Sequence, residues 1–545
     1  MAYSGLESER HHFDAKVSQK DLYETYLPAF KACIQEGKAF SIMGAYNRVN
    51  GEPCCGSKLL LEDILRKKWN FDGYIVSDCG AISDIFKFHK VVVSPEEAVA
   101  MVLNAGCDLF CCIVFGTKRN KRIVCDWIKG AVEKDLLTED IIDKSIKRLF
   151  NARFKLGMFD PPEIVPYAQI SFEVNDCDKH RDLARKAARE SIVLLKNQNN
   201  ILPLNKNIKS IAIIGPNADK LDVLLGNYNG IPSKYTTPLQ GIKNVGSPET
   251  EVYYAKGCPL KEKSTDGFNE AIEISKKSDV VIMVLGISPR IENEEGQAAE
   301  SDLKGDRIHL NIPEIQEKLL KEIHNIGKPI ILILTSGSAL SVNFAKENIP
   351  AIIEIWYPGE EGGAALADVI FGDYNPAGRL PVTFYKSVDQ LPDFRDYSMV
   401  GRTYRYFKDE PLFSFGFGLS YTKFKYSNLQ ISPSKVKIDE KITISADIEN
   451  IGDKLGDEVV QLYLNKRSIS SEAPIRELQS FKRITLKKGE RKTVSFILLP
   501  EQFSIFNENG EQIIQPGEIF ITVGGCQPGY SDTNINIVEG KFDII

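Results

Sequence analysis

Two places in this sequence bring carboxyl groups to the ends of apolar segments. Asp78 follows the apolar run YIVS, and a loop with several glutamates follows the run VVIMVL. The glutamates of that loop are Glu292, Glu294, Glu295 and Glu300. Sheets whose strands alternate with helices carry function at the carboxyl ends of their strands, so both places can hold catalytic acids. Both also have a structural interpretation, because an Asp can cap the next helix and an acidic loop can be merely solvated.

The elements before Asp78 and just after it alternate between short strands and longer helices. The apolar runs 40–47, 74–80 and 107–112 predict strands, and the segments 58–69 and 94–106 predict helices. The second helix opens with Ser-Pro-Glu-Glu and ends on Gly, as a capped helix should. Strand–helix–strand alternation predicts parallel strands joined by crossovers.

A second α/β region surrounds the acidic loop, from about residue 180 to 390. The runs 210–217, 280–288, 329–337 and 350–359 are apolar throughout, and helical segments such as 312–327 lie between them. This pattern predicts buried parallel strands in an open sheet with both faces covered.

From about residue 424 the pattern changes to short alternating segments, such as KITISADIEN and EVVQLYLN, separated by turn residues. This period of two predicts an antiparallel β-sandwich. We therefore divide the chain into a first α/β domain (1–160), a second α/β domain (161–390), a linker (391–423) and a β-sandwich (424–545).

The composition excludes several classes of function. The net charge of −6 over 545 residues makes nucleic acid a poor partner, and no apolar run is long enough to cross a membrane. Eleven cysteines in a chain of this length are not a disulfide framework, and their spacing fits no zinc site. We expect buried free thiols, no metal and no cofactor.

Seven segments spread over nearly the whole chain resemble glycoside hydrolase family 3. They are SGLESERHHF (4–13), MGAYNRVNG (43–51), GYIVSDCGAI (73–82), LLKNQNNILPL (194–204), YPGEEGGAALADVIFGDYNPAGRLPVTF (357–384), GRTYRYF (401–407) and FGFGLSYT (415–422). The resemblance implies a fold of the α/β plus all-β class. It consists of the C-terminal part of a (β/α)8-like barrel, an α/β sandwich and a fibronectin type III-like β-sandwich.

The resemblance also implies roles for the carboxyl groups. Retaining glycosidases use one carboxylate as nucleophile and another carboxyl group as acid and then base. Asp78 matches the family nucleophile, and Glu294 matches the second Glu of the I-E-A-E segment that supplies the acid/base in some relatives. Glu292, Glu295 and Glu300 remain alternatives. Repulsion among the four clustered carboxylates would raise the pKa of one of them, which suits an acid, but it does not show which one.

Three further residues match positions around the family's sugar site. Arg10 corresponds to an Arg that donates to sugar hydroxyls, Tyr46 to a Tyr beside the nucleophile, and Met43 to a wall of the pocket. Core packing is the alternative for Tyr46 and Met43, and an exposed Arg at a helix start is the alternative for Arg10. Cys79 stands where many glucosidases have Trp, and members with S-D-C tend to act on pentosides.

The family pattern has one gap in this sequence. A Lys-His pair that holds the sugar is expected just before Ala2, together with an earlier Asp, and about three of eight barrel strands are present. We expect the chain as written to be inactive by itself. Three explanations can account for this gap. The sequence is a fragment or has a mispredicted gene start, a separate chain supplies the remaining barrel segment, or the protein has lost catalysis. A fragment or mispredicted start would also have lost any signal peptide. The sequence as written predicts a cytoplasmic protein, and a secreted or periplasmic one if a signal peptide was lost.

The sequence thus predicts a retaining exo-acting β-glycoside hydrolase that releases single sugars, foremost xylose, from the non-reducing ends of oligosaccharides. A β-glucosidase is the alternative within the enzymes. A non-catalytic carbohydrate-binding or interaction protein is the alternative from another class. The expected partner is the oligosaccharide substrate, and the remaining barrel segment is a second partner if a separate chain supplies it. The oligomeric state is not predicted.

Overall fold

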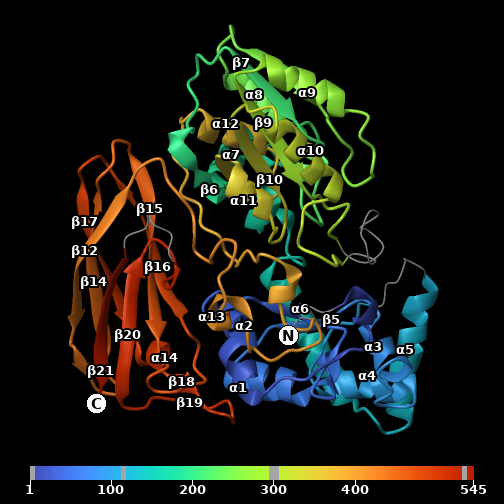
Figure 1. Ribbon diagram of the computed structural model, residues 1–545. Helices are drawn as coiled ribbons and strands as arrows, with labels where there is room; N and C mark the ends of the chain where they lie inside the picture. The colour runs from blue at the N-terminus through green and yellow to red at the C-terminus, as the bar shows by residue number, and fades with distance from the viewer. Residues whose placement is uncertain (1–5, 112–117, 294–305, 531–536) are drawn as a thin grey trace. The chain divides into compact units, whose positions relative to one another are not determined.

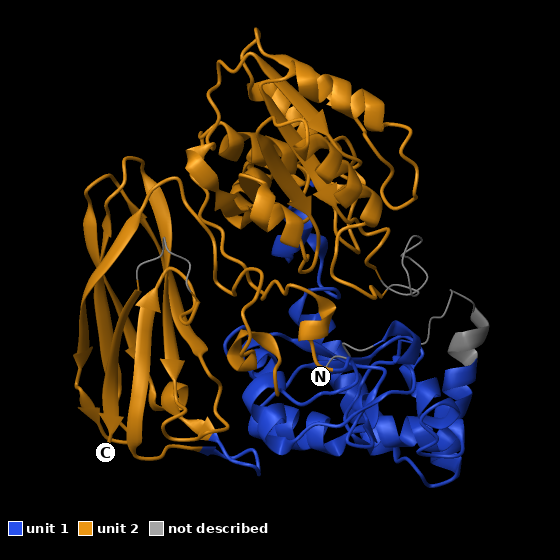
Figure 2. Ribbon diagram, viewed as in Figure 1, with its two compact units in different colours: residues 1–172, 393–399, 506–512 blue, residues 173–392, 400–505, 513–545 orange. Residues whose placement is uncertain are grey.

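The computed structural model describes residues 6–111, 118–293, 306–530 and 537–545, and the chain forms two compact units. Unit 1 contains residues 1–172, 393–399 and 506–512, and unit 2 contains the rest of the chain (Figure 2). None of the described helices is long and apolar enough to cross a membrane. The domain boundaries near residues 160, 390 and 423 stay predictions.

Unit 1 alternates short strands with longer helices. Its strands are β1 (Asp14–Ala15), β2 (Ser41–Gly44), β3 (Arg48–Val49), β4 (Glu52–Pro53) and β5 (Tyr74–Ser77). Its α-helices are α1 (Gln19–Asp21), α2 (Pro28–Gln35), α3 (Ala81–Lys87), α4 (Pro95–Asn104), α5 (Lys118–Glu133) and α6 (Glu139–Lys155), and a wider helix spans Lys58–Lys68. The helices predicted over 58–69 and 94–106 are confirmed within two residues. Ser94 accepts a hydrogen bond from Glu97 N and so caps α4, as its sequence indicates.

The strands that position Asp78 are β2 and β5. They pair in parallel, with Met43 opposite Val76 and Gly44 opposite Ser77. The segment 107–111 runs beside the other edge of β5, but it joins by one isolated bridge, Val76 to Leu109, and forms no regular strand. The strand predicted over 107–112 is therefore wrong as a regular element, although its course along β5 is right.

The core of unit 1 lies between these strands and the helices. Ile75 of β5 and Ile85 of α3 are fully buried, and they pack with Val99 and Val102 of α4. The outlying segment 393–399 joins this core, since the Tyr26 ring stacks on Tyr397 at 6.0 Å. Burial of one face of each helix is what fixes the course of the chain around β5.

Unit 2 begins with α7 (Asp178–Ser191) and a six-stranded sheet in the order β6-β11-β10-β9-β7-β8. These strands are β6 (Val193–Asn197), β7 (Ser210–Ile214), β8 (Glu251–Ala255), β9 (Val280–Gly286), β10 (Ile330–Thr335) and β11 (Ala351–Glu354). The helices between and after them are α8 (Pro238–Val245), α9 (Phe268–Lys277), α10 (Glu314–His324), α11 (Asn343–Asn348) and α12 (Gly362–Ile370). Figure 1 shows helices on both faces of this sheet.

The pattern of burial explains this sheet. Every residue of β7, β9, β10 and β11 is buried, as the uninterrupted apolar runs predict. The strands from β7 to β11 pair in parallel, whereas β6 pairs antiparallel with β11 at the edge. The direction of β6 is a feature that its sequence does not indicate.

The rest of unit 2 is an antiparallel β-sandwich after the short helix α13 (Thr403–Tyr406). One sheet has the order β12-β14-β17 and the other β13-β21-β20-β15-β16. Their bounds are β12 (Phe424–Ser432), β13 (Lys435–Val436), β14 (Ile442–Asn450), β15 (Gly456–Asn465), β16 (Glu477–Leu486), β17 (Arg491–Leu498), β20 (Gly517–Gly524) and β21 (Ile537–Ile544). The helix α14 (Pro500–Phe503) and the pair β18 (Ile505–Phe506) and β19 (Gln512–Ile513) lie between β17 and β20. The sandwich predicted from residue 424 is confirmed.

Candidate active site

Asp78 lies directly beyond the carboxyl end of β5. Its N–H donates to Gly44 O at 3.1 Å, which ties it to the end of β2. Its Oδ1 accepts a hydrogen bond from Cys79 N at 2.7 Å. Helix α3 begins only at Ala81, and its N-cap residue is Gly80, so the Asp78 carboxylate does not cap this helix. The Asp78 carboxylate is therefore available for catalysis at the end of the strand.

Tyr46 lies beside Asp78, close enough for the charge of that carboxylate to act on its hydroxyl. Burial raises the pKa of the Tyr46 hydroxyl, and the negative charge of Asp78 raises it further. The hydroxyl therefore stays protonated and is available as a donor beside the carboxylate.

Arg10 approaches the same ring from another element. Its guanidinium carbon lies 5.4 Å from the centre of the Tyr46 ring, and Nη1 donates to Glu7 Oε2 at 3.1 Å. Arg10, Tyr46 and Asp78 thus lie in one neighbourhood of unit 1, as their predicted roles require. Met43 on β2 is 58% exposed, so it is not buried in the core of unit 1.

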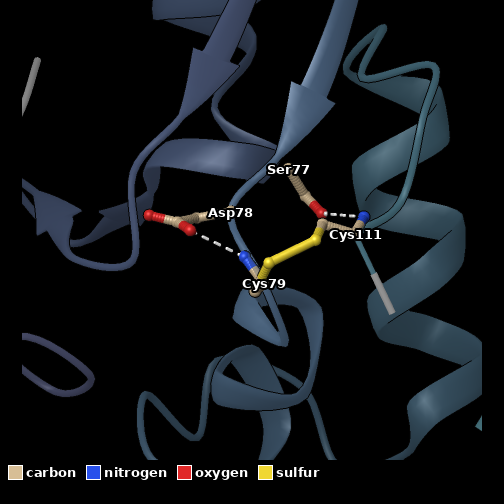
Figure 3. The surroundings of a disulfide bond; sticks show 4 residues. All are labelled: Ser77, Asp78, Cys79 and Cys111. Carbon is tan, nitrogen blue, oxygen red and sulfur yellow. Dashed lines mark hydrogen bonds between the residues drawn. A yellow bond between two sulfur atoms is a disulfide. The ribbon is translucent and has the colours of Figure 1, made fainter. Parts of the chain in front are cut away.

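Cys79 is bonded to Cys111 (Figure 3). Ser77 N donates to Leu109 O at 2.8 Å, and Gly80 N donates to Cys111 O at 2.9 Å. These bonds hold the two backbones side by side, with the Cα atoms of the two cysteines 4.5 Å apart. Figure 3 shows the Asp78 side chain pointing away from the disulfide.

The disulfide corrects the expectation that the cysteines are buried free thiols. That interpretation is wrong for Cys79 and Cys111, and also for Cys33 and Cys125, which are exposed. Cys54, Cys55, Cys107, Cys258 and Cys526 are free and buried, as expected. Among the described residues, no group of three or more His, Cys, Asp or Glu side chains is arranged to hold a metal ion.

The acidic loop of unit 2 is described up to Asn293 and again from Asp306. Glu294, Glu295 and Glu300 lie outside the described residues. Glu292 is described, and the donors around its carboxylate are Gly337 N, Ser338 Oγ and Tyr357 OH. Arg307 Nη1 also lies 3.7 Å from Glu292 Oε2. The Glu292 carboxylate is thus engaged on both oxygens.

The structure adds two residues to the neighbourhood of Asp78 that sequence reasoning missed. His11 Nδ1 lies 2.8 Å from Asp84 Oδ2, and the His11 ring meets the Tyr46 ring edge-on at 4.6 Å between centroids. His11 belongs to a segment that carries the family resemblance, whereas Asp84 lies just beyond another, and 73 positions separate the two residues in the sequence. Their pairing depends on β5 and α3 being placed against the N-terminal segment, which the sequence does not reveal.

Comparison with known proteins agrees with this geometry. The family model "Glycosyl hydrolase family 3 N terminal domain" matches residues 2–152, and "Glycosyl hydrolase family 3 C-terminal domain" matches residues 192–421. A model of a "Fibronectin type III-like domain" matches residues 458–527. Parallel strands with carboxylates at their ends, an α/β sheet and a β-sandwich are the parts that these models combine.

Individual relatives match over most of the chain. A β-xylosidase of Formosa agariphila is 38% identical over 524 residues, which cover 93% of this chain and 70% of the relative. A periplasmic β-glucosidase of Salmonella typhimurium is 33% identical and covers 100% of this chain and 72% of the relative. The solved structure of a GH3 exo-β-xylosidase in complex with a xylobiose aziridine activity-based probe has a TM-score of 0.87 and 29% identity, covering 98% of this chain and 69% of that one.

The chain belongs to glycoside hydrolase family 3. The predicted fold class, with the C-terminal part of a barrel, an α/β sandwich and a fibronectin type III-like sandwich, is confirmed. Its relatives include both β-xylosidases and β-glucosidases, and the chain spans about 70% of their length.

Proposed function

We propose that this protein is a retaining exo-acting β-glycosidase that releases single sugars, xylose foremost, from the non-reducing ends of oligosaccharides. The observation that carries this proposal is the carboxylate of Asp78 at the carboxyl end of β5. One oxygen accepts from Cys79 N at 2.7 Å, and the Tyr46 hydroxyl lies beside the same carboxylate. A retaining glycosidase needs such a carboxylate to attack the sugar.

In the proposed reaction, a carboxylate oxygen of Asp78 forms a bond to the anomeric carbon while the bond to the leaving oxygen breaks. Glu294, as the acid, gives its proton to that oxygen. Water then attacks the anomeric carbon, Glu294 takes a proton from the water, and the bond to Asp78 breaks. The engagement of Glu292 by its neighbours supports Glu294 over Glu292, because an acid/base group must be free to exchange its proton.

Cys79 supports xylose over glucose. The family resemblance places an aromatic platform at this position in many glucosidases, and here the side chain is small and held by Cys111. Small changes in contact at a sugar position are worth about 1–3 kcal/mol in discrimination. The preference is expected to be strong but not absolute.

We also propose that the 545-residue chain by itself is inactive in turnover. Among the described residues, β2 and β5 form a two-stranded sheet, whereas a closed barrel of this class has eight strands. Large apolar side chains are exposed on α6 and in the segment after it, namely Phe154, Met158, Ile164, Ile170 and Phe172. A segment with further barrel strands would cover such a face, and a misplacement of about 1 Å in the site can lower the rate about 100-fold.

Two measurements test the proposed function. The first is the ratio of kcat/KM for an aryl β-xyloside to that for an aryl β-glucoside, measured on the chain alone and after addition of barrel strands from the Formosa relative. The second is covalent labelling by a xylose-configured aziridine, followed by peptide mapping. Labelling depends on one attack by the nucleophile, so it stays measurable when turnover is slow.

The expected results are a xyloside preference and one label on Asp78. A glucoside preference with the label on Asp78 would replace xylose by glucose and keep the mechanism. A chain that binds xylo-oligosaccharides but takes up no label, alone or with the added strands, would be a binding protein, and the proposed activity would be wrong.

A further inference from the structure

We propose that His11 and Asp84 form a positioning pair that orients the guanidinium of Arg10 for sugar binding. This inference rests on the proposed function, because Arg10 meets a sugar only if unit 1 carries a glycosidase site. Neither His11 nor Asp84 is assigned a role by the family resemblance. The two residues come from the N-terminal segment and from α3, the first helix after Asp78.

The contact between Asp84 and His11 is short and shielded. Asp84 Oδ2 lies 2.8 Å from His11 Nδ1, and the Asp84 side chain is 5% exposed. Burial raises the pKa of Asp84, and the hydrogen bond to His11 opposes this effect. A buried carboxylate needs a hydrogen-bond donor, and His11 Nδ1 lies at the right distance to be that donor.

The other nitrogen of His11 meets Arg10. Arg10 Nε lies 3.3 Å from His11 Nε2, and an arginine Nε–H can only donate. His11 Nε2 must therefore be the acceptor, and the ring proton must lie on Nδ1, directed at Asp84. The two hydrogen bonds thus assign the neutral tautomer with its proton on Nδ1. A carboxylate partner fixes the tautomer of functional histidines in the same way.

These contacts fix three sides of the Arg10 guanidinium. Nε donates to His11, Nη1 donates to Glu7 at 3.1 Å, and the plane lies over Tyr46. Tyr46 in turn lies beside Asp78. Asp84 thus acts through His11 on the residue that would hold the sugar beside the nucleophile, and the side chains that reach the substrate are pre-oriented.

The tautomer can be measured without any substrate. The chain has six histidines, so selective labelling of histidine with ¹⁵N gives few ring signals. The signals that disappear in His11→Asn belong to His11. We expect a protonated Nδ1 and an unprotonated Nε2 at pH 7.5. In Asp84→Asn, which no longer offers a carboxylate to the ring, this tautomer should lose its dominance. A proton on Nε2 in the wild-type chain would overturn the inference, whether or not the chain hydrolyses glycosides.

Two replacements separate the two bonds of His11. The amide of His11→Asn can reach Asp84 from the position of Nδ1, but it leaves Arg10 Nε without its acceptor. The amide oxygen of His11→Gln reaches the position of Nε2 and can accept from Arg10. We expect the rate constant for aziridine labelling of Asp78 to fall about 10-fold or more in His11→Asn, since a lost charged hydrogen bond is worth about 1.5–3 kcal/mol. His11→Gln should recover most of the rate.

A double-mutant cycle with Arg10→Ala completes the test. If His11 acts through Arg10, His11→Asn has no further effect on labelling in the Arg10→Ala background. An equal loss in both backgrounds would show a general structural role and would overturn the inference. Unlabelled wild-type chain would count against the proposed function, and the tautomer measurement would still decide the role of His11 and Asp84.

Discussion

The backbone N–H of Cys79 donates a hydrogen bond of 2.7 Å to the carboxylate of Asp78. The same residue is joined through its sulfur to Cys111, whose N–H donates to Ser77 Oγ at 3.0 Å. The Cys79 N–H is thus restrained by the disulfide to Cys111 and by the hydrogen bond between Cys111 and Ser77, the residue before Asp78. Because a fixed donor lowers the reorganisation that a charged group needs, the disulfide supports the Asp78 carboxylate without touching it.

The first prediction concerns this disulfide. Cys79→Ala combined with Cys111→Ala should lower the stability of unit 1 by about 3 to 4 kcal/mol, because closing a loop of this length restricts the unfolded chain. The separation of the two cysteines in sequence is 32 residues. Denaturation in urea, followed by a probe within residues 1–172, measures the change. The labelling rate of Asp78 should fall as well.

Cys33→Ser serves as the matched control, because Cys33 is an exposed free thiol in the same unit. It should change neither the stability nor the labelling rate. A double variant as stable as the wild-type chain would show that the bond does not restrain unit 1.

The second prediction concerns Asp78 itself. In the presence of the added barrel strands, Asp78→Ala should lower hydrolysis of an aryl β-xyloside by several orders of magnitude and abolish labelling, because only binding and electrostatic effects remain. Azide should restore part of the turnover and give a glycosyl azide of inverted configuration. Asp72→Ala, at an exposed position near the start of β5, is the control. Near-normal hydrolysis by Asp78→Ala would remove this residue from the mechanism.

Local sequence patterns predicted most helices and strands of this fold, but they could not predict which distant segments pair. The apolar run 280–288 predicts a buried parallel strand, and β9 spans Val280–Gly286 with every residue buried. In contrast, β6 pairs antiparallel with β11, and no local pattern specifies a partner or a direction.

The site shows the same limit. The apolar run before Asp78 predicts a strand end, and the family resemblance predicts its neighbours Tyr46 and Arg10. The partners of Cys79 and of His11 lie 32 and 73 positions away in sequence. They meet only because the segment 107–111 and α3 are packed against β5 and the N-terminal segment. Contacts of this kind depend on tertiary packing, which residue spacing alone does not encode.

The third prediction separates two glutamates of the acidic loop. Protonation matters most for poor leaving groups, so Glu294→Ala should slow xylobiose hydrolysis far more than hydrolysis of a dinitrophenyl xyloside. Glu292→Ala should show no such asymmetry. It should instead destabilise unit 2 by about 2 to 4 kcal/mol, because Tyr357 and Arg307 lose a partly buried partner. An asymmetry in Glu292→Ala would transfer the acid role to that residue. The same pair of substrates applied to Glu295 and Glu300 variants covers the remaining alternatives.

The fourth prediction concerns stability and pH. Glu354, at the carboxyl end of β11, is fully buried, and Trp356 N donates to its Oε1 at 2.8 Å. Burial raises the pKa of this carboxyl well above its ordinary value, and the negative charge of Glu292 adds to the effect. The folded protein therefore holds a proton at a pH where the unfolded chain has released it. The free energy of unfolding must fall as the pH rises above about 4.5, the ordinary value for Glu.

Glu354→Gln keeps the shape and the acceptor for Trp356 N but cannot ionise. The variant should match the wild-type chain near pH 4.5 and become increasingly more stable than it toward pH 8. Each pKa unit is worth about 1.4 kcal/mol, and each kcal/mol moves the melting temperature of a unit of this size by about 1–2 °C. Thermal unfolding at several pH values measures the gap between the two proteins. Glu347→Gln, at an exposed position before β11, should show no pH-dependent gap. A Glu354→Gln variant that is less stable than the wild-type chain at pH 8 would mean that the folded protein uses the ionised carboxylate, and the sign argued here would be reversed.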